Sequence, residues 1–161
     1  MIKLLLSMKE ELNVMFAAAP SWNDVLATLV SDPDIDWSRI NAFHMDEYIG
    51  LSRTAPQGFG NFLRERVFGK AQFKSVNSIN PEATDSPAEA GRYEALLLAH
   101  PMDVCILGIG ENGHVAFNES GLLRAKAMFC IVPTANKAEA VNSAKGLQNR
   151  AASFCSLSEW E

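Results

Sequence analysis

The sequence is poor in the features of disulfide-stabilised, membrane-spanning and nucleic-acid-binding proteins. Its three cysteines, Cys105, Cys130 and Cys155, are odd in number and widely spaced, which predicts buried thiols in a reducing cytoplasm and no disulfide framework or metal site. No stretch reaches the ~20 apolar residues of a membrane span, and the run at 4–6 is too short for a signal peptide. There is no run of Lys or Arg, and the net charge of -5 argues against a nucleic-acid or anionic-membrane partner.

What is present is typical of one ordinary globular domain. The chain has 161 residues, 48% hydrophobic and 20% charged, with no repeat and no low-complexity linker. We therefore expect a single domain over residues 1–161. A small anionic substrate is compatible with the acidic balance, because a pocket can be locally positive.

Apolar runs that predict strands alternate with runs at helical spacing. Strands are expected at 12–17, 39–43, 75–79, 104–107 and 128–132, with helices at 1–11, from Ser21 onward and over 88–100. The loop 80–87 is expected to be solvated. This alternation predicts an α/β fold: a doubly wound, mostly parallel sheet flanked by helices in a Rossmann-like three-layer arrangement. Aromatic and aliphatic residues at 59–68 also recur at helical spacing and indicate core or subunit contacts, which leaves a homo-oligomer open.

Polar residues follow two of the predicted strands. After the run 104–107 come Gly108, Gly110 and Gly113, which let a ligand approach the backbone, and His114, whose ordinary pKa lies near neutrality. A turn with a merely hydrogen-bonded histidine is the alternative. The cluster 43–51 follows the second strand, so both clusters are expected at one crevice at the carboxyl edge of the sheet.

The segments Met45–Leu51 and Gly108–Glu119 resemble the two marker segments of the glucosamine-6-phosphate deaminase/isomerase family, in the same chain order. The likeness runs with gaps over about residues 12–144. It implies conversion of glucosamine 6-phosphate and water to fructose 6-phosphate and ammonia, with no cofactor and no metal. By this resemblance Asp46 is the proton-transfer base, His114 opens the sugar ring, and Asn112 and Glu119 orient the imidazole. Glu47 is either a second carboxylate of the site or a structural residue.

The resemblance also implies a phosphate site. Ser21 and Asp24 have the spacing of a capping box, so the loop before them is predicted to lie at a helix N-terminus, where anions bind. An ordinary strand-to-helix turn is the alternative, since the usual glycines are missing. The family context favours a sugar phosphate bound by Ala18, Ala19, Ser21, Gly110, Gly113 and Lys137.

The sequence departs from the family in length. Shortly after Glu119 it passes to residues 122–127, which resemble a much later family segment, so a strand, helices and a phosphate-binding arginine are missing between them. A domain of marginal stability could hardly lose that much core. We therefore expect an incomplete or aberrant form of a family member. Two other functions stay open: a 6-phosphogluconolactonase-like hydrolase on the same fold, or a non-catalytic sugar-phosphate-binding protein.

Overall fold

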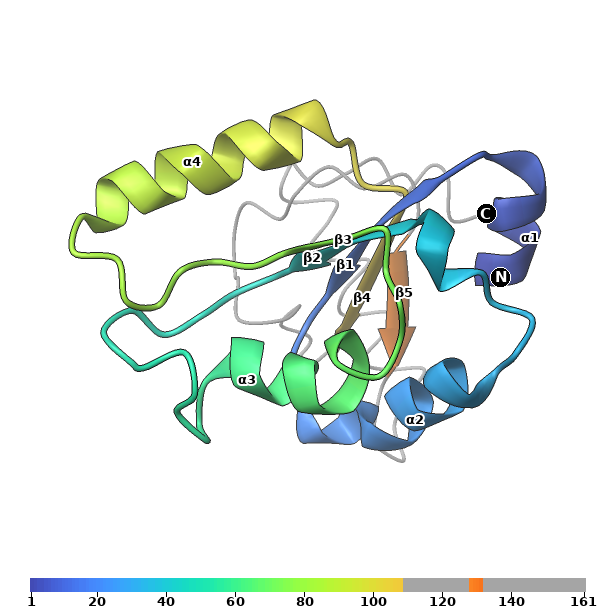
Figure 1. Cartoon of the computed structure of the whole chain (residues 1–161), viewed down its shortest axis with the longest axis horizontal. Coiled ribbons are helices and arrows are strands. Elements are labelled where there is room, and N and C mark those ends of the chain that lie inside the picture. The colour runs from blue at the N-terminus through green and yellow to red at the C-terminus, as the bar shows by residue number, and fades with distance from the viewer. Residues whose placement is uncertain (109–127, 132–161) are drawn as a thin grey trace, which may run out of the picture.

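The computed structural model describes residues 1–108 and 128–131, and its centre is one parallel sheet (Figure 1). The sheet has five strands in the order β3-β2-β1-β4-β5. They are β1 (Leu12–Phe16), β2 (Ile40–His44), β3 (Ser75–Asn77), β4 (Val104–Gly108) and β5 (Met128–Ile131). The chain moves outward from β1 to β3 and then crosses back to β4, so the strand order reverses between β1 and β4. All five predicted strands are confirmed.

The register aligns the carboxyl ends of the central strands. Leu12 of β1 pairs with Ile40 of β2, and Phe16 pairs with His44 at the other end. On the other side of β1, Phe16 pairs with Ile106 of β4. Near-continuous apolar runs suit these strands, because a parallel sheet is buried on both faces.

Helices cover both faces of the sheet, as Figure 1 shows: α4 (Ser86–Ala99) lies on one side, and α2 (Asn23–Ser31) and α3 (Phe59–Leu63) lie on the other. The π-helical turn η3 (Arg64–Phe68) continues α3, the 3₁₀ turn η2 (Trp37–Arg39) precedes β2, and α1 (Ile2–Met8) packs on the same core as α2. The α/β class with a parallel sheet between helices is confirmed. The single-domain prediction includes residues outside the described ranges and stays a prediction.

The predicted capping box at Ser21 is wrong. Ser21 lies inside a 3₁₀ turn, η1 (Pro20–Trp22), and α2 starts at Asn23 with no side-chain cap. Pro20 favours a first helical position, and the burial of Trp22 ties this turn to the core. The loop 80–87 is largely exposed, as expected, and the exposed Asp85 carboxylate accepts the Ala88 N–H at 3.0 Å and caps α4.

A buried tyrosine joins α4 to the end of β2. The Tyr93 hydroxyl accepts the His44 N–H at 2.9 Å, and it can donate to the His44 carbonyl at 2.6 Å or the Asn77 carbonyl at 3.1 Å. Pairing between β2 and β3 stops at Phe43 and Asn77. The Tyr93 hydroxyl therefore supplies hydrogen bonds to the backbone of His44, the next residue of β2. Tyr93 therefore fixes the backbone just before the second polar cluster.

We expect Tyr93→Phe to lower the free energy of unfolding by about 1–3 kcal/mol, because it leaves buried backbone groups of His44 without partners. Tyr48→Phe is the matched control, since the Tyr48 side chain is 51% exposed and its ring stays. Urea denaturation of both variants measures the difference. Equal losses in the two variants would contradict the role given to the Tyr93 hydroxyl.

Candidate functional site

The ends of three neighbouring strands are held together beyond their last paired residues. The Met45 N–H donates to the Phe16 carbonyl at 3.0 Å, and the Ala17 N–H donates to the Ile106 carbonyl at 2.8 Å. These bonds hold the carboxyl ends of β1, β2 and β4 side by side at one edge of the sheet. Strand order reverses at the same place, and open α/β sheets bind their ligands at such switch points.

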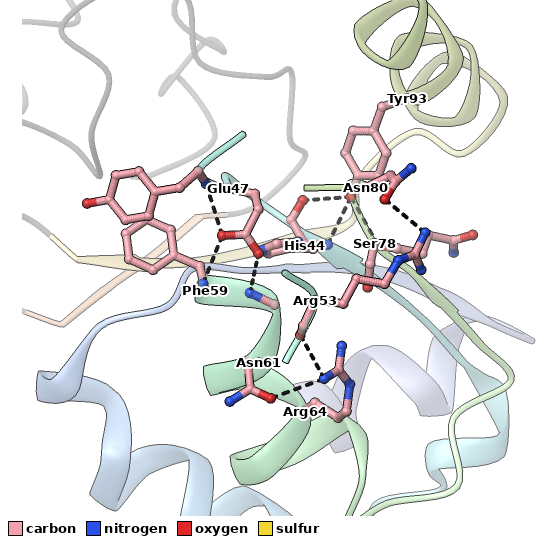
Figure 2. Close-up of polar contacts among 12 residues, drawn as sticks. His44, Glu47, Arg53, Phe59, Asn61, Arg64, Ser78, Asn80 and Tyr93 are labelled. Atoms are coloured by element: carbon pink, nitrogen blue, oxygen red, sulfur yellow. Dashed lines mark hydrogen bonds and ion pairs between the residues drawn. The ribbon is translucent and has the colours of Figure 1, made fainter. Parts of the chain in front are cut away.

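Glu47 anchors the loop that follows β2 (Figure 2). Its side chain is only 3% exposed, and the carboxylate accepts the N–H groups of Tyr48 at 2.9 Å, Phe59 at 2.9 Å and Gly60 at 2.8 Å. The last two belong to the start of α3. These contacts favour the structural alternative for Glu47: the side chain is occupied in closing the loop 48–58 onto the end of β2.

His44 is a buried residue of this region to which the sequence reasoning gave no role. Its side chain is fully buried, with Nε2 at 4.0 Å from Oε2 of Glu47, and neither ring nitrogen makes a hydrogen bond of ordinary geometry with a described residue. Burial lowers the pKa of His44 to about 4, against the attraction of the Glu47 charge. The ring is therefore neutral at pH 7. A histidine at the last position of an apolar strand was the only signal in the sequence.

Asp46 lies between His44 and Glu47 in the sequence, and the pKa of its carboxyl group is raised, as is common for functional residues. One carboxylate oxygen, Oδ1, is buried with no hydrogen-bond partner among the described residues. Burial, followed by the nearby negative charge of Glu47, raises the pKa of Asp46 to about 6. A carboxyl group with that pKa is mostly ionised at pH 7 and is a better base than an ordinary aspartate. A pKa shift of this size at the carboxyl end of a strand indicates a candidate functional residue.

The loop after β1 contains the predicted phosphate-binding residues Ala18, Ala19 and Ser21. Pro20 has no N–H, and the Trp22 N–H is used by the Ala19 carbonyl at 2.9 Å. The Asn23 N–H donates to the Pro20 carbonyl. The loop stands at the N-terminus of α2 as predicted, but it has fewer free backbone donors than a glycine-rich loop.

The other predicted site residues lie outside the described residues: Gly110, Asn112, Gly113, His114, Glu119 and Lys137. Gly108, which leads into that segment, ends β4 beside the loop after β1. Within residues 1–108 and 128–131 no group of three His, Cys, Asp or Glu side chains is arranged to hold a metal. No helix in this part of the chain is long and apolar enough to cross a membrane.

Fold and site together define an α/β protein with a carboxyl group of raised pKa at the carboxyl edge of a parallel sheet, on the strand next to the switch point. The family described as glucosamine-6-phosphate isomerases/6-phosphogluconolactonase matches residues 5–140. The chain belongs to this family, as the resemblance of its two marker segments predicted.

Similar proteins bear names from both branches of the family. A glucosamine-6-phosphate deaminase of Listeria monocytogenes serotype 4a (strain HCC23) is 39% identical over 111 residues, which are 69% of this chain and 47% of that protein. The structure of a monomeric glucosamine-6-phosphate deaminase matches with a TM-score of 0.64 at 27% identity, over 74% of this chain and 54% of that chain. A 6-phosphogluconolactonase from Thermotoga maritima has a TM-score of 0.65 at 24% identity, over 72% and 54% of the two chains, and shows the fold alone. The chain spans about half the length of the deaminases it matches.

The pKa shifts of His44 and Asp46 have opposite effects on stability. Below pH 6.5 the unfolded chain protonates His44 while the folded chain does not until about pH 4, so acid weakens the fold through His44. Asp46 takes up its proton at about pH 6 in the folded state and at 3.8 in the unfolded state, so acid strengthens the fold through Asp46.

We therefore expect Asp46→Asn to steepen the loss of stability on acidification. Between pH 6 and pH 4 the variant should lose about 1–2 kcal/mol more unfolding free energy than the wild type, allowing for solvent screening of the partly exposed carboxyl group. Urea titrations at several pH values measure the two slopes, and the other titrating groups are common to both proteins. Parallel slopes would contradict the raised pKa of Asp46.

Proposed function

We propose that this protein is a glucosamine-6-phosphate deaminase of amino-sugar catabolism, with Asp46 as the base that moves a proton from C2 to C1 of the opened sugar. The observation that carries the proposal is Asp46 itself, a carboxyl group whose pKa is raised to about 6 at the carboxyl edge of the sheet. The deaminase relative at 39% identity supports this branch of the family.

The reaction suits a base of this kind. Removing the C2 proton of the open-chain amino sugar needs a base stronger than an ordinary carboxylate but still ionised at neutral pH. Loss of the C2 proton, with a proton added to the C1 aldehyde oxygen, gives an enolamine. Returning the proton to C1 gives an imine at C2, and water adds to that imine and releases ammonia to give the ketose. The buried, unpartnered Oδ1 of Asp46 is free of competing hydrogen bonds from the described residues. It can therefore take and return a proton without first breaking a contact.

The remaining roles come from the family likeness and complete the proposal. His114 opens the ring, and Asn112 and Glu119 orient its imidazole. The sugar phosphate is held by Ala18, Ala19 and Ser21 together with Gly110, Gly113 and Lys137. The reaction needs no cofactor, and we infer a single domain and a cytoplasmic location, as for other enzymes of sugar-phosphate metabolism.

Asp46→Asn should abolish ammonia release from glucosamine 6-phosphate and leave ligand binding nearly intact, because the amide keeps the shape and loses the base. In the wild type, turnover should rise with pH through about 6 as Asp46 ionises. Ammonia release across pH, with binding followed by the shift in melting temperature, checks both outcomes. Full activity in the variant would refute the assignment of Asp46.

His114→Gln should slow turnover by about 10²–10⁴-fold, the usual contribution of one general acid or base. Part of the loss should return when the substrate is supplied in an open-chain form, because the ring-opening step is then bypassed. His100→Gln is the control, since His100 lies at the end of α4 with Nδ1 at 2.9 Å from the Leu96 carbonyl. Equal losses in both variants would remove His114 from the mechanism.

The assay that decides between the family's activities compares ammonia release with lactone hydrolysis by the full-length wild-type protein. Ammonia release supports the deaminase. Hydrolysis of 6-phosphogluconolactone without ammonia would move the protein to the lactonase branch. No detectable activity in either assay, with sugar-phosphate binding retained, would indicate a non-catalytic binding protein.

A further inference from the structure

We propose that the indole N–H of Trp22 is a hydrogen-bond donor to the phosphate group bound between the loop after β1 and the end of β4. The inference rests on the sugar-phosphate site of the proposed function and adds a residue that contributes to its specificity. The indole N–H of Trp22 is buried and has no hydrogen-bond partner among the described residues.

Trp22 is enclosed in the core, yet its polar atom is unsatisfied. The residue is 1% exposed, and Nε1 has no hydrogen-bond partner among the described residues. A buried polar group without a partner is costly, and such groups are rare in folded proteins. Phenylalanine would fill much of the same apolar space without that cost. The indole N–H therefore calls for an acceptor.

The position of Nε1 points to where that acceptor binds. A Cβ atom built on Gly108 would lie 3.8 Å from Nε1, so the indole N–H lies beside the carboxyl end of β4. The Ala17 N–H bond to the Ile106 carbonyl holds the loop after β1 beside the same end. The site is thus bordered by the first residues of α2, a helix of nine residues, whose dipole favours an anion.

The loop also needs a donor from a side chain. Glycine-rich loops hold phosphates with several backbone N–H groups. Here Pro20 supplies none, and the N–H groups of Trp22 and Asn23 are used within the turn by the carbonyls of Ala19 and Pro20. The indole N–H of Trp22, which lies beside the same place, replaces part of these lost backbone donors.

The chemistry of indole gives this donor a preference. An indole nitrogen donates a hydrogen bond and cannot accept one. It therefore suits an oxygen without a proton, such as that of a phosphate-ester dianion, and gains nothing from a sugar hydroxyl that must donate. The ring is also fixed in the core, which spares the entropy of ordering a long polar side chain on binding. Trp22 thus favours the phosphorylated sugar over the free sugar.

The test follows the indole N–H signals in nitrogen–proton correlation spectra of the wild-type chain. The protein has three tryptophans, so Trp37→Phe and Trp160→Phe assign the Trp22 signal by elimination without altering Trp22. Adding inorganic phosphate, and then glucosamine 6-phosphate, should move the Trp22 signal downfield to saturation. Glucosamine at the same concentration and ionic strength should leave it in place.

Trp22→Phe should weaken the affinity for inorganic phosphate by about 10- to 100-fold, the usual value of a hydrogen bond to a charged group. Trp37→Phe is the matched control, because Trp37 is also buried but lies just before β2, at the opposite edge of the sheet. Phosphate affinity in that variant should equal the wild-type value.

The outcomes separate this proposal from the proposed function. An unmoved Trp22 signal under saturating phosphate, or unchanged affinity in Trp22→Phe, overturns the role of Trp22 even if the protein releases ammonia. A Trp22 signal that moves with phosphate supports the role even if ammonia is never released, and the deaminase assignment then fails alone. The spectral test does not depend on the folding of the Trp22 variant.

Discussion

The buried charge of Glu47 is the constraint on which the candidate site depends. Three N–H groups, from Tyr48, Phe59 and Gly60, hold its carboxylate in place, so a single side chain closes the loop after β2 and starts α3. The same charge opposes ionisation of Asp46 and favours protonation of His44. Burial lowers the pKa of His44 more than this attraction raises it, so the histidine remains neutral. Burial and the Glu47 charge thus set the pKa of Asp46 at about 6, so that Asp46 is mostly ionised at pH 7 but more basic than an ordinary aspartate.

The opposite face of the sheet supports the same strand end. Tyr93 on α4 fixes the backbone of His44, and one turn earlier on that helix Glu89 accepts the Asn80 N–H at 2.6 Å. Glu89 is paired with Arg92, which lowers the pKa of Glu89 to about 2, and Arg92 also donates to the Ser78 carbonyl. The loop after β3 is thus tied to α4 (Figure 2). Asp46 follows a strand end held from above by α4 and from below by Glu47 at α3, which suits a base that must keep its position.

The sequence predicted those parts of the structure that depend on apolar periodicity. The five strands were predictable because buried parallel strands are continuous apolar runs, and α4 because its spacing is helical and Pro101 follows it. The features it did not predict depend on tertiary contacts. The Ser21–Asp24 spacing matched a capping box, but the burial of Trp22 and the geometry of Pro20 produced a 3₁₀ turn. The roles of His44 and Glu47 depend on packing against Gly60, which is distant in sequence and which no local pattern reveals.

The two tasks of the proposed reaction, proton transfer and phosphate binding, depend on different parts of the chain. Proton transfer between adjacent carbons needs one base at a fixed place, and the described residues supply that base with its supports on β2, α3 and α4. Phosphate binding needs several donors from different loops, because one loop cannot surround an anion. The loop after β1 offers part of such a set, with Trp22 in place of backbone donors lost to Pro20 and to the turn. The residues after Gly108 would have to complete it.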